Sequence, residues 1–407
     1  LYPDPGQAYS DSGVDAFIDR LYRTTEMRLK VIDHLRRRED WDFFMVVFSG
    51  TDTVSHAMWK YMDTTHPLHD RTKHLKYGGA IQAFYQYVDR ALGALIDSLG
   101  EDTVVMLMSD HGFGPFYKFI HVNNWLQQQG WMQIKRNPVA LLKAALFRLG
   151  FAPMSIYNLL MLFGLGRLKR EVVRGGRGQD LLKRLFLSFE DVDWSRTEAY
   201  SLGNVGQIFL NVRGREPAGI VEPGPDYERL RDEIMARLGE IRDPETGEKV
   251  VQGIYRREEI YSGPALDHAP DIVFIPTRME YFGFGEYEFG SNRVIEQMKR
   301  GISGTHRLQG IFLLHGEPVR AGAWVEGAQI IDLAPTILHL MGEPVPAGMD
   351  GRVLTQALQE AFEPAPAAAG ANGAGEPGEP GEFSADELTA EDEEVIIQRL
   401  RGLGYVG

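Results

Sequence analysis

Apolar residues recur at helical spacing between residues 13 and 38, with charged residues between them. This spacing predicts an amphipathic helix on the surface of a domain. A run of bulky apolar residues follows at 43–48 and stops at Ser49 and Gly50. Such a continuous run is typical of a strand buried on both faces within a parallel sheet. Helix followed by strand is the rhythm of an α/β fold.

The same pattern returns further along the chain. Apolar positions at helical spacing from about 77 to 99 predict a second helix, and Gly100 supplies a usual helix end. A second buried strand is predicted at 104–108. Parallel strands joined by a helix end at the same edge of their sheet, so the residues that follow the two strands are expected to lie close together.

An acid and an imidazole follow each predicted strand. Asp52 and His56 are four positions apart, so a helical turn capped by Thr51 places both on one face. Asp110 and His111 follow the second strand. Either pair alone is more often a helix cap or a turn with a surface histidine than a metal site. The two pairs together predict one site with ligands for a divalent cation.

A third candidate, His306, lies in a glycine-rich stretch between Gly301 and Gly310, directly before an apolar strand at 311–314. Small residues at such a place let the backbone come close to a ligand. Taken singly, His306 is more often a loop residue bonded to backbone. The interpretation of His306 as a metal ligand depends on the two Asp and His pairs that precede it in the chain.

Composition narrows the classes of function. The chain has 407 residues, of which 43% are apolar, and this is ample for a buried core. A formal net charge of -14 argues against binding of a nucleic acid duplex, whose phosphates require clustered Lys and Arg. An anionic small substrate stays open, because a bound divalent cation outweighs the overall charge locally. The absence of cysteine excludes disulfides and thiolate zinc sites and leaves the compartment undecided.

The first residues read as loop, and the chain begins at Leu1 with no visible signal or transit segment. We therefore expect a fragment or a processed chain, and we assign no localisation. No stretch reaches the roughly 18 consecutive apolar residues that would predict a membrane span.

Three motifs along the chain form a recognisable series. The series consists of Thr-Asp-x3-His, then Ser-Asp-His-Gly, then Gly-x-His-x3-Gly. It resembles the alkaline phosphatase superfamily, and most closely its type I phosphodiesterase/nucleotide pyrophosphatase family. The resemblance covers roughly residues 13 to 356. Further stretches that look like parts of this family lie at 211–217, 243–247, 269–274, 331–338 and 349–352.

The resemblance implies a fold and a metal site. The implied fold is a three-layer α/β/α sandwich with a mostly parallel central sheet. By the same resemblance, Asp52, His56 and His306 hold one metal ion, while Asp110 and His111 contribute to a second. Two such ions about 4 Å apart clamp a phosphoryl group. Imidazole and carboxylate ligands suit Zn²⁺, and Mn²⁺ also accepts them.

The family also uses an upstream Asp as a further ligand and a neighbouring Thr or Ser as the covalent nucleophile. No position before Asp52 matches them. The hydroxyls of Ser49, Thr51 and Ser55 belong to the ligand motif itself, and we interpret them as structural. We expect the nucleophile upstream of Leu1. The 407 residues then hold one complete metal triad and half of the other, which puts the activity of this exact polypeptide in doubt.

The resemblance and the composition together divide the chain. Residues 1–362 are expected to form the hydrolase domain, without its N-terminal part and with a helical insertion at about 136–190 that caps the site or touches lipid. Residues 363–386 are rich in Pro, Ala, Gly and Glu, which predicts a flexible linker. Residues 387–407 predict a helical tail that docks on the domain or on a partner.

The function expected from these features is hydrolysis of a phosphate-ester small molecule through a two-metal site, with phosphodiesters and nucleotide pyrophosphates as the favoured substrates. A related phosphomonoesterase, sulfatase or phosphotransferase shares much of the metal set. The alternative of a different class is a non-catalytic binding protein, which applies if the nucleophile is truly absent. The oligomeric state is not predicted.

Overall fold

The computed structural model describes residues 13–156, 184–203, 206–283, 289–299, 301–359 and 362. The described helices are α1 (Val14–Arg38), α2 (Gly50–Met62), α3 (Arg71–Tyr77), α4 (Ala80–Ile96), α5 (Val122–Gln129), α6 (Pro138–Arg148), α10 (Pro225–Leu238), α11 (Arg257–Ile260) and α12 (Leu333–Leu340). The described strands are β1 (Val105–Met108), β2 (Gly112–Pro115), β3 (Lys118–Ile120), β4 (Ala199–Tyr200), β5 (Gln207–Leu210), β6 (Val251–Arg256), β7 (Ile272–Pro276), β8 (Tyr281–Gly283), β9 (Ile295–Gln297), β10 (Gly304–Arg307) and β11 (Phe312–His315). The described chain contains both helices and strands, so the predicted α/β character is confirmed at the level of fold class.

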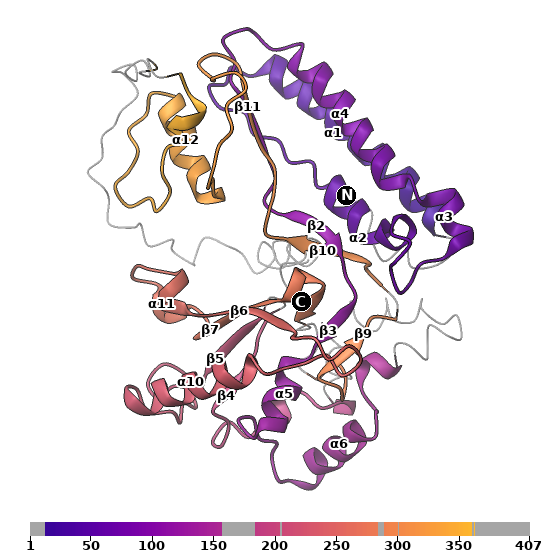
Figure 1. The fold of residues 1–407 in the computed structure, drawn as a ribbon, viewed down its shortest axis with the longest axis vertical. Coiled ribbons are helices and arrows are strands. Elements are labelled where there is room, and N and C mark those ends of the chain that lie inside the picture. Colours follow the sequence, from indigo (N-terminus) through magenta and orange to yellow (C-terminus); the bar gives the residue numbers. More distant parts are fainter. Residues whose placement is uncertain are drawn as a thin grey trace.

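The N-terminal helices pack around one apolar cluster in the upper part of the molecule (Figure 1). Phe17 and Leu21 of α1 and Phe84 of α4 are fully buried there, together with Met58 of α2. The helices predicted at 13–38 and 77–99 are confirmed as α1 and α4. Acidic Asp15 lies in the first turn of α1 and basic residues lie in its last turn, which matches the helix dipole.

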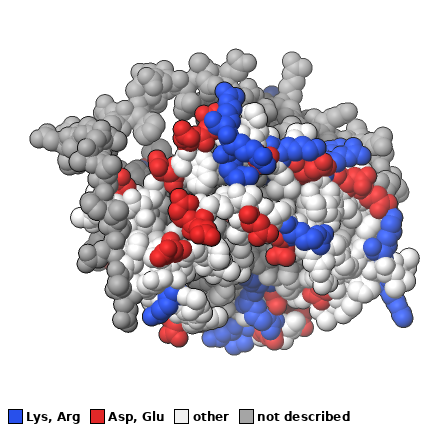
Figure 2. All heavy atoms as spheres, turned by 90° about the horizontal axis from the view of Figure 1, so that it is seen from above, with Lys and Arg blue, Asp and Glu red and all other residues white. Residues whose placement is uncertain are grey.

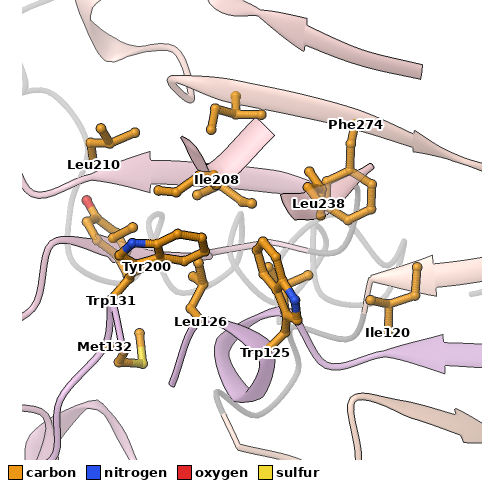
Figure 3. Packing of buried hydrophobic residues seen from close by; sticks show 14 of the residues in the cluster. Ile120, Trp125, Leu126, Trp131, Met132, Tyr200, Ile208, Leu210, Leu238 and Phe274 are labelled. Carbon is orange, nitrogen blue, oxygen red and sulfur yellow. The ribbon is translucent and has the colours of Figure 1, made fainter. Parts of the chain in front are cut away.

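A larger apolar cluster joins the four-stranded sheet β4-β5-β7-β6 to the helices of the lower part of the molecule (Figure 3). Ile208 and Leu210 of β5 and Phe274 of β7 are buried on the sheet side. Trp125 of α5 and Trp131 pack beneath them with ring centroids 5.4 Å apart. The cluster includes Ile120 of β3, the strand that follows β2 along the chain.

The predicted parallel central sheet is not found in the described part of the chain. The strands form sheets of two, two, three and four strands, in which β3 pairs with β8 in parallel and the remaining ladders are antiparallel. The strand predicted at 104–108 is confirmed as β1, but it pairs with β11 in the antiparallel direction. The predicted parallel partner of β1 was the segment at 43–48, and that segment forms no strand.

The segment at 43–48 is not a strand, which corrects the prediction made from its apolar run. Phe43, Met45 and Val47 are 53%, 69% and 57% exposed. The residues between them are half-buried, so the side chains alternate as in a strand. The described chain supplies no ladder partner for this segment, and its apolar residues therefore remain at the surface.

Part of the predicted insertion is helical. α6 begins behind Asn137, whose side chain accepts a hydrogen bond from the Ala140 amide, and Pro138 occupies the first turn. Residues 157–183 of the insertion lie outside the described residues, as do the predicted linker at 363–386 and tail at 387–407. Across the described helices, none is long and apolar enough to cross a membrane.

Basic and acidic side chains are interspersed on the face shown in Figure 2. Among the described residues of this face, acidic groups lie next to the basic ones.

Candidate metal centre

The N-terminus of α2 delivers the first two candidate ligands. The helix begins at Gly50 with Ser49 at the N-cap position, so Thr51 lies inside the helix and is not the cap that was predicted. Asp52 and His56 occupy positions i and i+4 on one face, as predicted. His56 Nε2 lies 3.3 Å from Asp52 Oδ1. Gly50 is required by close packing, since a Cβ atom there would lie 2.6 Å from the ring of Phe84.

A two-stranded ribbon brings the second and third motifs together. β2 begins directly after His111, and it pairs with β10 so that His306 lies opposite Phe113. The glycine-rich approach to β10 was predicted to let the backbone approach a ligand. Gly304 instead approaches α2, where an added Cβ would lie 2.6 Å from the Ser55 carbonyl oxygen. The ribbon therefore rests on the helix that carries Asp52 and His56.

Three ligand atoms from separate motifs converge at this contact. His306 Nε2 lies 3.3 Å from Asp52 Oδ1 and 3.1 Å from His56 Nε2. With the 3.3 Å between His56 Nε2 and Asp52 Oδ1, the atoms form a nearly equilateral triangle. Atoms that share a tetrahedral zinc ion with bonds of about 2.0–2.2 Å lie about 3.3 Å or slightly more from one another. The triangle thus has the size that a single bound ion requires.

His111 adds a fourth side chain to this group. Its ring stacks on that of His306 with centroids 3.7 Å apart, and its Nε2 lies 3.8 Å from Asp52 Oδ1. Ligand atoms of Asp52, His111 and His306 all lie within 4.8 Å of one another. Asp110 is more peripheral, since its side chain is 58% exposed and its Oδ2 lies 3.6 Å from His111 Nε2. All five predicted residues therefore lie at one place, with Asp110 at its rim.

The electrostatics of the group favour a cation. Asp52 Oδ1 is buried and has no hydrogen bond of good geometry, an arrangement that is costly unless a positive group is close. Burial raises the pKa of Asp52, but His306 and His56 lower it by more, so the carboxyl is ionised. Burial is also the main cause of a lowered pKa for His306. Neutral imidazole beside a carboxylate is the state that binds a metal ion.

Backbone carbonyls orient two of the imidazoles. His56 Nδ1 is 2.8 Å from the Gly304 carbonyl oxygen, and His111 Nδ1 is 3.0 Å from that of Gly112. A proton held at Nδ1 leaves Nε2 as the ligand atom, which is the usual arrangement in metal sites. These carbonyl contacts depend on the folded ribbon and leave no signal in the sequence.

Phe113 is the residue of this site that sequence reasoning missed. Its ring lies at centroid distances of 4.8 Å from His56, 6.1 Å from His111 and 5.6 Å from His306. Trp59 of α2 stacks on it at 5.8 Å. Its position directly after Asp-His-Gly is the only trace that the sequence carries.

The side-chain hydroxyls next to the site donate hydrogen bonds to backbone carbonyls at the start of α2. Thr51 Oγ1 donates to the Phe48 carbonyl and Ser55 Oγ donates to the Thr51 carbonyl. These bonds agree with the structural role predicted for both residues. Neither hydroxyl is therefore assigned as a nucleophile.

A carboxylate and three imidazoles without a thiolate form a candidate site for a divalent metal ion with nitrogen and oxygen ligands. The family follows from comparison. Residues 8–157 match the model of the type I phosphodiesterase / nucleotide pyrophosphatase family, so the family that the motifs indicated is confirmed over this part of the chain. The match includes Asp52, His56, Asp110 and His111. Neither the curated proteins nor the solved structures gave a match.

Proposed function

We propose that this protein is a metal-dependent hydrolase of phosphate diesters or nucleotide pyrophosphates, with Asp52, His56 and His306 as the ligands of one metal ion. The observation that carries the proposal is the triangle of Asp52 Oδ1, His56 Nε2 and His306 Nε2, with sides of 3.1 to 3.3 Å. The family match supports a hydrolase of the phosphodiesterase/nucleotide pyrophosphatase type.

His111 and Asp110 are proposed as ligands on the second-metal side of the site. His111 stands between the triangle and the exposed carboxylate of Asp110, with 3.6 to 3.8 Å to an oxygen of each neighbour. Exposed Asp110 leaves that side accessible to a substrate from solvent. When bound, divalent ions polarise a phosphoryl group and neutralise its developing charge.

Residues around the site orient the candidate ligands and exclude water from one side of it. Gly304 and Gly112 carbonyls fix the imidazoles of His56 and His111. Phe113 and Trp59 cover one side with aromatic surface, which excludes water and strengthens the electrostatic interactions there. The donor set fits zinc, and manganese is the second candidate.

Metal content tests the ligand assignment. Purified chain, loaded with Zn²⁺ and dialysed, is compared with Asp52→Ala and His306→Ala, and with His34→Ala, which changes an exposed histidine of α1. Loss of an outer-shell partner costs about 10–100-fold in metal affinity, so loss of a ligand is expected to cost at least that, while His34→Ala retains the metal. Equal zinc in all four proteins would overturn the assignment.

Substrate class is tested separately. Hydrolysis of bis(p-nitrophenyl) phosphate is compared with that of p-nitrophenyl phosphate and p-nitrophenyl sulfate by the metal-loaded protein. The proposal expects the diester to be preferred. Preference for the monoester or the sulfate would replace it with a related hydrolase. Metal binding without any hydrolysis would favour the non-catalytic binding protein, for which the unassigned nucleophile is the supporting observation.

A further inference from the structure

We propose a second, separate metal-binding site formed by His69 and His74 at the C-terminal end of α2, which takes a transition-metal ion such as Zn²⁺, Ni²⁺ or Cu²⁺. His69 lies in the loop before α3, and His74 lies within α3. Their ring centroids are 5.2 Å apart with an interplanar angle of 59°. Neither residue belongs to the group around Asp52.

The ring separation and ring tilt of this pair are close to those of the proposed ligand pair in the first site. His56 and His306, whose Nε2 atoms are 3.1 Å apart, have ring centroids 5.0 Å apart and an interplanar angle of 55°. Two imidazoles bound to one tetrahedral ion, with bonds of about 2.0–2.1 Å, place their centroids about 5 Å apart. The distance between the ring centroids of His69 and His74 is therefore close to the distance that a shared ion requires.

Both rings are also held in the tautomer that a metal needs. His69 Nδ1 is 3.1 Å from the Lys60 carbonyl oxygen, and His74 Nδ1 is 2.7 Å from that of Tyr61. These carbonyls are consecutive in the last turn of α2, so both rings present Nδ1 to the same helix end. A proton at Nδ1 leaves the Nε2 lone pair as the ligand, as it does for His56. Within the described chain, neither Nε2 atom makes a hydrogen bond.

The other histidine and the carboxylates near this pair already have hydrogen-bond partners and are not counted as ligands. His66 is excluded because its Nε2 is 3.0 Å from the Phe116 carbonyl oxygen and its Nδ1 accepts a hydrogen bond from the Leu68 amide. The carboxylate of Asp63 accepts from Thr65, and that of Asp70 caps α3. The site thus offers two imidazoles, with water in the remaining positions. Such ligands select the later transition metals over Ca²⁺ and Mg²⁺, which prefer oxygen.

A bound ion would tie the start of α3 to the loop that follows α2. The opposite end of α2 carries Asp52 and His56, so this ion would stabilise the helix that supports the first site. An ion that binds the folded chain and not the unfolded chain raises the free energy of unfolding.

Metal titration of the full chain tests the second site independently of the first. In the variant Asp52→Ala/His111→Ala/His306→Ala, which removes proposed ligands of both ions of the first site, Ni²⁺ and then Zn²⁺ are titrated against a competing chromophoric chelator. One ion is expected to bind. Adding His69→Gln and His74→Gln should weaken its binding by at least about tenfold, whereas adding His34→Gln should not. Equal binding with and without the two Gln substitutions would overturn the proposal.

A second measurement guards against a variant that does not fold. His69→Gln and His74→Gln are each added singly to the variant Asp52→Ala/His111→Ala/His306→Ala, in which the first site lacks its ligands. Each protein is checked by circular dichroism, and its thermal unfolding is followed with and without Ni²⁺. The parent should gain thermal stability from Ni²⁺, and each single variant should lose that gain. A gain retained in both single variants would contradict the proposal. Failure to bind metal at Asp52 and His306, with binding at His69 and His74, would overturn the proposed function alone. The reverse result would overturn the His69/His74 site alone.

Discussion

Phe113 lies among all three histidines of the candidate metal centre, opposite His306 across the β2–β10 ribbon. Side-chain hydrogen bonds fix one atom of an imidazole, but the plane of the ring is fixed by what packs against it. For His56 the packing surface is the edge or face of Phe113, at an interplanar angle of 80°. Phe113 is therefore a positioning residue, which acts through the ligands.

Replacing Phe113 with Leu should lower metal affinity about tenfold, the lower end of the effect of an outer-shell partner. Leucine keeps apolar volume but removes the flat surface that orients His56 and His306. Zinc affinity is measured by competition with a chelator, and folding by circular dichroism. The control is Phe151→Leu, which disturbs a stack with Phe186. A Phe113→Leu protein with unchanged affinity would show that the histidines are held without the ring.

The site residues themselves were predictable because each follows from a local motif. Asp52 and His56 share a helix face because they are four positions apart in α2, which begins at Gly50. The contributions of Phe113 and of the Gly304 carbonyl were not predictable. They arise from the pairing of β2 with β10, which joins segments about two hundred residues apart.

At the scale of elements, a buried ion pair anchors β3, which follows the β2 end of the ribbon. Lys118 Nζ lies 2.6 Å from Asp243 Oδ2 and 2.6 Å from Glu245 Oε2. The Asp243 side chain is fully buried, and it also accepts a hydrogen bond from the Tyr281 hydroxyl of β8. The stretch 243–247, which resembled part of the family, thus has a structural role.

Asp243→Asn should destabilise the fold by about 3 kcal/mol, because it leaves the Lys118 charge buried with one exposed partner, Glu245. Chemical denaturation measures the free energy of unfolding. The control Glu245→Gln removes the exposed partner and should cost about 1 kcal/mol or less. Equal losses for the two variants would contradict a dominant role for Asp243.

The same pair predicts a dependence of stability on pH. Burial raises the pKa of Asp243, but Lys118, the Glu245 amide and Tyr281 lower it by more, so its pKa lies below the ordinary value when the protein is folded. A lowered pKa contributes stability above the ordinary carboxyl pKa of about 3.9, and that contribution is lost as pH falls through the folded pKa. Wild type should therefore lose more stability than Asp243→Asn in acid below about pH 4.

At the scale of the whole molecule, local pattern predicted the helices α1 and α4 and the strand β1, but it did not predict how strands pair. The periodicity that defines α1 and α4 lies within each helix and survives in the fold. A strand instead takes its identity from its neighbours. The apolar run at 43–48 has the composition of a buried strand, yet no strand of the described chain pairs with it. Likewise β1 forms where predicted but takes β11 as an antiparallel partner.

An unpaired extended segment with alternating exposed apolar side chains is a template for association. We expect the chain to self-associate as concentration rises, through Phe43, Met45 and Val47. Replacing Met45 with Lys and Val47 with Thr should shift the mass measured by light scattering toward the monomer. The control Leu149→Lys changes a residue that is 85% exposed after α6 and should leave association unchanged. A wild-type chain that stays monomeric at high concentration would show that the exposed apolar segment does not pair with another copy.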